Sequence, residues 1–138
     1  MLVNDFIEAT AKQLKTLFPS RYVFVDEIPQ QADGNHFVRC IDQGHTKGLY
    51  RQRKRDYSFE VLYFQSKKDS LSFNMWAEIM YSNFESLTIN GKSFRLIGAK
   101  ARSGEDMVFR FLFDADIYAW VKSDGEKMTT LHNTEGIK

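Results

Sequence analysis

The apolar residues near the N-terminus recur at the spacing of one face of an α-helix. Residues three and four positions apart lie on the same side of a helix. The series consists of Leu2, Val3, Phe6, Ile7, Ala11, Leu14, Leu17 and Phe18. Asn4 and Asp5 stand where a helix cap and a first-turn acid belong, and Pro19 interrupts the pattern. The pattern therefore predicts an amphipathic helix that ends near residue 18.

Three strands are expected after this helix. Residues 21–28 and 36–41 are short segments rich in β-branched and aromatic side chains. Residues 53–65 alternate between apolar and polar positions, which is the pattern of a strand with one face toward the core. The positions on the apolar face are Tyr57, Phe59, Val61 and Tyr63. We expect these three segments to form part of one sheet.

A second helix and a hairpin are predicted in the middle of the chain. The helix is indicated by an apolar stripe made of Phe73, Trp76, Ala77, Met80 and Phe84. The dipeptide Asn90-Gly91 then tolerates the positive φ angles of a tight type I′ turn. This turn would join a strand at residues 87–89 to a strand that runs back over residues 94–101.

Residues 107–121 form the longest strand candidate. Its odd positions are apolar and include Phe109, Phe111, Phe113 and Ile117. Its even positions mix apolar residues with charged ones, so we expect something to cover the second face of this strand as well. The order of helix, three strands, helix and three strands predicts an α+β fold, with a mainly antiparallel sheet and two helices packed on one face.

Composition favours one soluble globular domain. The chain has 138 residues, of which 43% are hydrophobic and 27% are charged, and one core is usual at this length. We expect a single domain over residues 1–122 and a C-terminal extension over residues 123–138, which is flexible or packs on a neighbour. The net charge of +1 argues against a general nucleic-acid binder. No signal peptide or membrane span is expected, and the lone Cys40 favours synthesis inside a cell.

The motifs of common enzyme and cofactor sites are absent from the sequence. The three histidines, His36, His45 and His132, are far apart, and Cys40 has no partner cysteine for a zinc site. The sequence contains no phosphate-binding glycine loop and no nucleophile elbow. We therefore expect no catalytic residue, no metal and no cofactor.

Two aspartates in the last long strand could have a function. Asp114 and Asp116 are two residues apart, so they share one face of a strand. Such a pair could bind a divalent cation or hold a proton at a shifted pKa. It could equally be a solvated or cross-strand charge pair. Both interpretations stay open.

A basic segment is the sharpest charge anomaly in the chain. Arg51, Arg53 and Arg55 alternate along the third strand, with Lys47 and Lys54 nearby, and no acid interrupts the stretch from His45 to Arg55. Three interpretations follow: contact with another protein subunit, binding of nucleic-acid phosphates, or plain solvation. Asp114 and Asp116 of an adjacent subunit would be a complementary acidic patch.

The residue patterns resemble a known family along nearly the whole chain. They are the helix NDFIEATAKQL, the stretch YVFVDEIPQ, the strand YSFEVLYF after a basic run, the helix FNMWAEIMYSNFESL and the strand MVFRFLFDADIYAWV. Together they resemble the tail terminator-like proteins of phages and phage-derived tail elements of Gram-positive bacteria. Aromatic residues make up 14% of the chain, and their enrichment at protein interfaces agrees with an oligomer.

The resemblance implies a structural protein of the virion tail rather than an enzyme. It implies a two-layer fold that assembles into a ring of six subunits, caps the tail tube, ends its polymerisation and provides a head-tail joining surface. The implied partners are further copies of the chain, the tail tube protein and a head-side connector, with DNA only passing through the lumen and no membrane. Before assembly the protein would lie in the host cytoplasm. The alternative function is a small nucleic-acid-binding module that uses residues 47–55.

Overall fold

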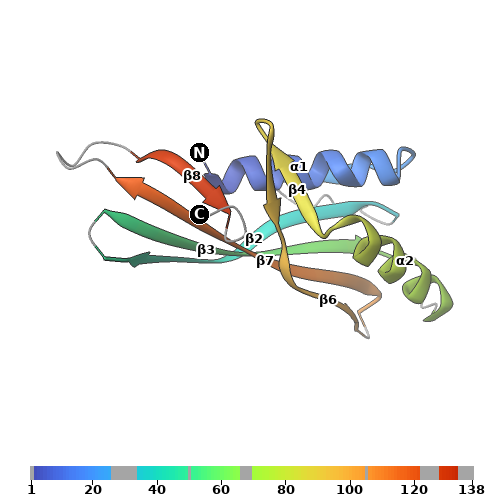
Figure 1. The fold of residues 1–138 in the computed structure, drawn as a ribbon. Helices are drawn as coiled ribbons and strands as arrows, with labels where there is room; N and C mark the ends of the chain where they lie inside the picture. The colour runs from blue at the N-terminus through green and yellow to red at the C-terminus, as the bar shows by residue number, and fades with distance from the viewer. Residues whose placement is uncertain are drawn as a thin grey trace.

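The structure of the chain, a computed structural model, describes residues 2–25, 34–49, 51–65, 70–104, 106–121 and 128–133. Two helices, α1 (Leu2–Leu17) and α2 (Ser70–Asn83), lie with a main sheet of six strands and a separate two-stranded hairpin (Figure 1). The predicted α+β class, with two helices and a mainly antiparallel sheet, is confirmed. The predicted first helix is also confirmed, since α1 ends one residue before Phe18, and Asp5 lies in its first turn as predicted. The predicted cap at Asn4 is wrong, because the helix already includes Leu2 and Asn4 lies inside it.

Strands β3 and β7 form the centre of the main sheet. The strands are β1 (Val23–Phe24), β2 (His36–Lys47), β3 (Gln52–Phe64), β6 (Ile97–Ser103), β7 (Val108–Val121) and β8 (Met128–Asn133). Their order is β1-β2-β3-β7-β6, and β8 pairs with β7 beyond the end of β6. The β1–β2 pair is parallel, and the other pairs are antiparallel. The proposed division of the chain at residue 122 stays a prediction.

The short hairpin of β4 (Ser86–Ile89) and β5 (Lys92–Arg95) lies beside α1 (Figure 1). Asn90 and Gly91 have φ angles of 52° and 80°, so the predicted turn between positive-φ residues is confirmed. The single return strand predicted over residues 94–101 is wrong. The strand ends at Arg95, and the chain then starts β6 in the main sheet at Ile97. Gly98, with φ of 66°, lies within a register shift of that pairing and locally redirects the backbone.

Two predicted strand lengths also need correction. The strand expected over residues 21–28 is only Val23–Phe24, and residues 26–28 lie outside the described part of the chain. The strand expected over residues 36–41 continues to Lys47. Its second half is polar and exposed, so hydrophobic periodicity could not reveal it. This half is held by pairing with β3 instead.

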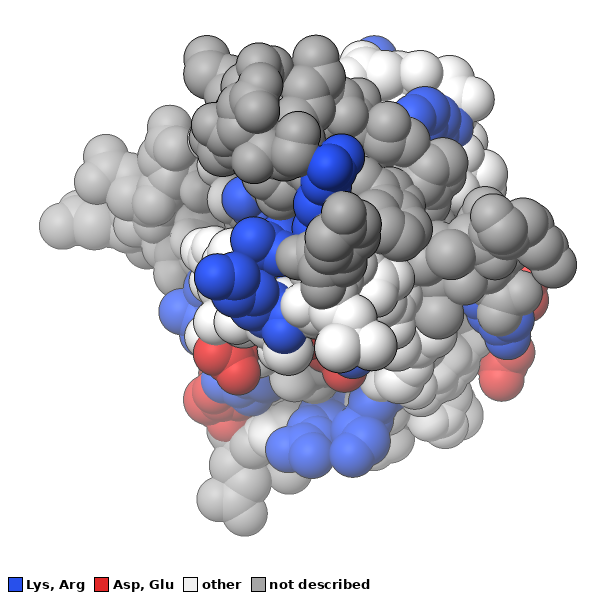
Figure 2. Space-filling model, turned by 60° about the vertical axis from the view of Figure 1, so that its left-hand side comes forward, with Lys and Arg blue, Asp and Glu red and all other residues white. Residues whose placement is uncertain are grey.

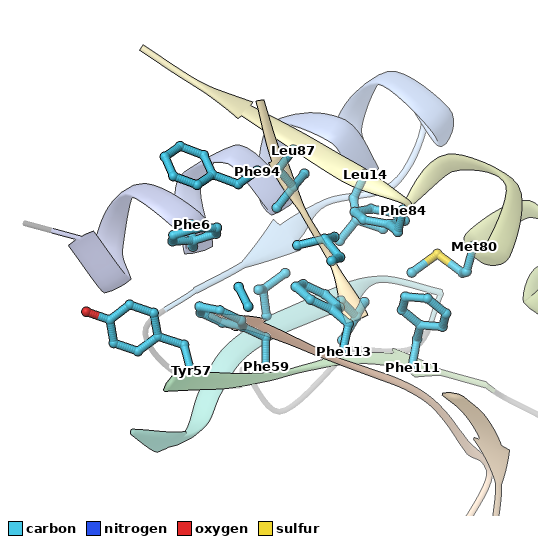
Figure 3. Packing of buried hydrophobic residues seen from close by; sticks show 14 of the residues in the cluster. Phe6, Leu14, Tyr57, Phe59, Met80, Phe84, Leu87, Phe94, Phe111 and Phe113 are labelled. Atoms are coloured by element: carbon cyan, nitrogen blue, oxygen red, sulfur yellow. The ribbon is translucent and has the colours of Figure 1, made fainter. Parts of the chain in front are cut away.

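The core lies on the side of the sheet that carries the odd positions of β3 and β7. Phe59, Phe111 and Phe113 point from these strands toward Phe6 of α1 and Phe84, which follows α2 (Figure 3). The ring centroids of Phe6 and Phe59 are 5.6 Å apart, and those of Phe59 and Phe113 are 5.4 Å apart. Many of the aromatic residues noted in the composition therefore pack against one another in the core.

Candidate subunit-contact surface on the charged hairpin

The hairpin of β2 and β3 projects past the aromatic core. Its strands stay in register up to Lys47, which lies opposite Arg53. The turn is closed by hydrogen bonds in which the Gly48 N–H donates to the Gln52 carbonyl (2.9 Å) and the Gln52 N–H donates to the Leu49 carbonyl (3.1 Å). Leu49 is 88% exposed. The hairpin therefore extends the two strands beyond the core cluster, with side chains on both sides of the sheet.

A β-bulge decides which residues of β2 share a face with the arginines. The register shifts between Cys40 and Asp42, so one extra residue is inserted and the alternation of side chains is reversed beyond it. After the bulge, His45 lies opposite Arg55 and Lys47 lies opposite Arg53. Paired residues of neighbouring strands point to the same side of a sheet.

The result is a basic face at the end of the molecule. It consists of His45, Lys47, Arg53 and Arg55, on the side of the sheet that carries the core further along. Arg51 lies in the adjacent turn. No ion pair to Arg55 is found among the described residues. Figure 2 looks toward this end of the molecule and shows Lys and Arg side chains gathered there, with fewer Asp and Glu side chains in view.

The opposite side of the same sheet carries an acidic face. Strand alternation and register place Asp42, Asp56, Asp114 and Asp116 on it. Asp56 and Asp116 lie directly opposite each other on β3 and β7. Like charges in this position repel, so the pair needs a cation.

Lys54 is the cation within this acidic face. Its Nζ is 3.4 Å from Asp56 Oδ1 and 3.8 Å from Asp116 Oδ2. The two carboxylates raise the pKa of Lys54, Asp116 first and Asp56 second. Burial raises the pKa of Asp116, and the hydrogen bond with Asp56 adds to this effect. Lys54 thus contacts two carboxylates of the acidic face.

The same side of the sheet is better balanced toward α2. Buried Glu60 accepts a hydrogen bond of 2.7 Å from Arg39 Nη2, and its Oε2 is 3.9 Å from Arg110 Nε. Arg110 Nη2 lies 2.6 Å from Asp106 Oδ2. This chain of two arginines and two acids carries no excess charge. The four aspartates of the acidic face lie in the hairpin half of the sheet, away from these two arginines and two acids.

The structure separates the basic segment into two parts. Lys47, Arg53 and Arg55 come together on the basic face with Arg51 beside them, whereas Lys54 lies on the acidic face. Asp114 and Asp116 share a face as the sequence predicts. Sequence reasoning missed Asp42 and Asp56, because their placement depends on the bulge and on the β3–β7 register. Alternation from Asp114 alone could not reveal either residue.

Pockets and polar clusters elsewhere offer little for chemistry. A pocket of about 570 Å³ lies between α1 and β4 and contains no histidine or cysteine in its lining. Within the same residues, no group of three or more His, Cys, Asp or Glu side chains is placed to hold a metal ion. The charged hairpin is therefore the candidate site on which the described residues offer the clearest grouping of charge.

The chain belongs to the phage tail terminator family. The family model described as phage tail terminator protein matches residues 5–127, and the family has a structural role in phage tails. Seven chains of solved structures are similar to this protein. One has a TM-score of 0.50 and 14% identity, over 83% of this chain and 89% of the other, which shows a shared fold alone.

Two further findings complete these comparisons. The search of curated proteins gave no match. Neither helix in the described part of the chain has the length and apolar character needed to span a membrane. An origin in Gram-positive bacteria stays a prediction.

Proposed function

We propose that the chain assembles into a closed ring, most simply of six copies, that caps the tail tube. The ring ends polymerisation of the tube and provides the surface for joining the head, and its lumen lets DNA pass. Membership of the phage tail terminator family supports this proposal. The ring needs no catalytic residue, since capping is a matter of binding.

The charge pattern of the hairpin is the observation that carries the proposal. A closed ring of identical subunits needs two different patches that match each other, because each copy meets its two neighbours through unlike surfaces. The basic face and the acidic face are unlike, complementary and on opposite sides of one sheet. A head-to-tail arrangement can therefore bring the basic face of one copy against the acidic face of the next.

In this contact Arg53 and Arg55 approach Asp114 and Asp116 of the neighbouring copy. Lys54 already neutralises part of the acidic face within its own chain. The arginines of the neighbour supply the remaining positive charge, with planar donors suited to carboxylates. Complementary charges of this kind set register and association rate.

Charge reversal tests the contact. The double variant Arg53→Glu, Arg55→Glu should lose ring formation by light scattering and electron microscopy. Both side chains are half-buried, so the melting temperature is measured in parallel to separate loss of assembly from loss of the fold. Adding Asp114→Lys and Asp116→Lys to this double variant should restore part of the assembly. The matched control is Lys100→Glu with Arg102→Glu, two exposed cations on alternate positions of β6, which should assemble normally.

Two results would contradict the proposal at different levels. A strict monomer at high concentration, with no ring in the presence of the cognate tube protein, would exclude the capping function. Normal assembly of the arginine variant would exclude the hairpin contact and leave the ring itself possible.

The basic face also supports a second candidate function, binding of nucleic acid. Four basic positions on one surface could contact successive phosphates. In that case the arginine variant should retain less DNA, its affinity for DNA should depend less steeply on salt concentration, and ring formation should be unaffected. Measuring DNA retention and oligomer mass on the same preparations separates the two functions.

A further inference from the structure

A pocket of about 210 Å³ lies between the segment after α1, the end of β3 and α2. Phe18, Tyr63 and Trp76 contribute aromatic rings to its lining, Met75 and Ile79 contribute apolar side chains, and Arg21 contributes a cation. We call it the Arg21 pocket. None of these residues belongs to the basic face or the acidic face of the hairpin.

The aromatic lining of the Arg21 pocket is held in place from beneath. The fully buried ring of His36 stacks on Phe18 with a centroid distance of 4.9 Å and on Tyr63 with one of 4.7 Å. Trp76 Nε1 donates a hydrogen bond of 3.1 Å to His36 Nε2. The rings are therefore fixed before any partner arrives, which lowers the entropy lost on binding.

Arg21 is held over this lining by contacts of its guanidinium with two of the rings. Its guanidinium carbon lies 4.7 Å from the centroid of Phe18 and 4.4 Å from that of Tyr63. Among the described residues no carboxylate forms an ion pair with it. A guanidinium stacked on aromatic rings still presents its N–H donors at its edge, in the geometry that suits a carboxylate.

An apolar stripe on α2 continues from the Arg21 pocket. Leu71, Met75 and Ile79, spaced four residues apart, are 75%, 69% and 36% exposed. The opposite side of the helix buries Trp76, Ala77 and Met80 in the core. Glu78 is the single charged residue of α2. A helix that is apolar on both sides normally has a partner on each.

We propose that the Arg21 pocket and this stripe dock a segment of the tail tube protein that presents an apolar side chain beside a carboxylate. The apolar group packs on Met75, Ile79 and Trp76, and the carboxylate pairs with Arg21. The proposal rests on the proposed ring: the two hairpin faces meet neighbouring copies, and capping requires one further contact with the tube. Figure 1 shows α2 at the opposite end of the sheet from the hairpin turn, so the stripe takes no part in the proposed hairpin contact.

Co-sedimentation with tubes assembled from the cognate tube protein tests the docking surface. Arg21→Gln and Met75→Ser should each weaken binding to the tubes by about tenfold or more, while ring mass by light scattering stays unchanged. Arg102→Gln and Met107→Ser are matched controls, because they change an exposed arginine and a 43% exposed methionine outside the pocket. Both controls should bind tubes as the wild type does.

The possible failures are distinguishable. Tubes that bind both pocket variants as well as the wild type would overturn the docking surface and leave the capping function intact. Loss of the ring in these variants would show that the pocket is a contact between copies. Loss of binding to the head-side connector alone would show that the pocket joins the head. Either result would overturn the proposal. A wild-type ring that does not bind tubes would overturn both the docking surface and the capping function. Unchanged melting temperatures check that Met75→Ser, at an exposed site, leaves the fold intact.

Discussion

The buried imidazole of His36 makes the stability of the fold depend on pH. Its side chain is 0% exposed. Burial and the nearby positive charge of Arg21 lower its pKa from 6.5 to about 3. Between these two values the unfolded chain binds a proton at His36 and the folded chain does not. The free energy of unfolding is therefore lower at every pH below 6.5, and the loss stops growing near pH 3.

The expected size of this effect follows from the two pKa values. Each pH unit well below 6.5 costs about 1.4 kcal/mol while the folded ring stays neutral. Because the titration of the unfolded chain is gradual near its midpoint, the loss between pH 7 and pH 5 is about 2 kcal/mol. A single domain is commonly stable by only about 5–15 kcal/mol, so the change is measurable.

Urea unfolding at pH 7, 6 and 5 measures the effect in the wild type and in His36→Phe. The variant should be less stable at pH 7, because Trp76 Nε1 loses its acceptor, but its stability should fall by about 2 kcal/mol less between pH 7 and pH 5. Asp116, whose pKa is raised, changes stability with pH in the opposite direction, and it is present in both proteins. Equal pH dependence of the two proteins would refute a neutral His36 in the fold.

Three further outcomes are expected. Phe111→Ala removes a fully buried ring that contacts Phe84 and Phe113, and chemical denaturation should show a loss of about 3–5 kcal/mol; a loss below about 1 kcal/mol would contradict the packing. The Cβ added by Gly91→Ala meets no atom within 4 Å, but the residue has a φ angle of 80°, so backbone strain should cost about 1–2 kcal/mol in the same assay; an unchanged free energy of unfolding would contradict the positive φ angle. Chelation with EDTA should leave the melting temperature unchanged, since the described residues include no group placed for a metal; a rise of several degrees with any divalent cation would point to Asp114 and Asp116 instead.

The elements that the amino-acid sequence predicts well are those with one face buried in the core. The odd positions Phe109, Phe111, Phe113 and Ile117 are all buried, because burial and strand alternation impose the same period of two. The Asn90-Gly91 turn was also predictable, since few residue pairs accept two positive φ angles. Both features are local, so a single sequence contains the information that specifies them.

The parts that sequence missed depend on contacts between distant segments. The second half of β2 is polar and exposed, so only its pairing with β3 makes it a strand. Asp56 joins Asp116 because β3 and β7 pair in one particular register. The Arg21 pocket combines residues from the segment after α1, from β3 and from α2. No periodicity within one segment could predict such combinations.

The bulge between Cys40 and Asp42 explains how one strand serves both the core and the charged surface. Before the bulge, Val38 lies opposite Val61 and faces the core; after it, Lys47 lies opposite Arg53. If the strand instead paired regularly through Ile41, with no bulge, the alternation would continue, and Lys47 and His45 would turn to the face that carries Asp56 and Asp116. Lys47 would then partly neutralise the acidic face, and the basic face would lose the charge of Lys47. The bulge therefore keeps opposite charges on opposite sides of the sheet, as a head-to-tail contact between identical subunits requires.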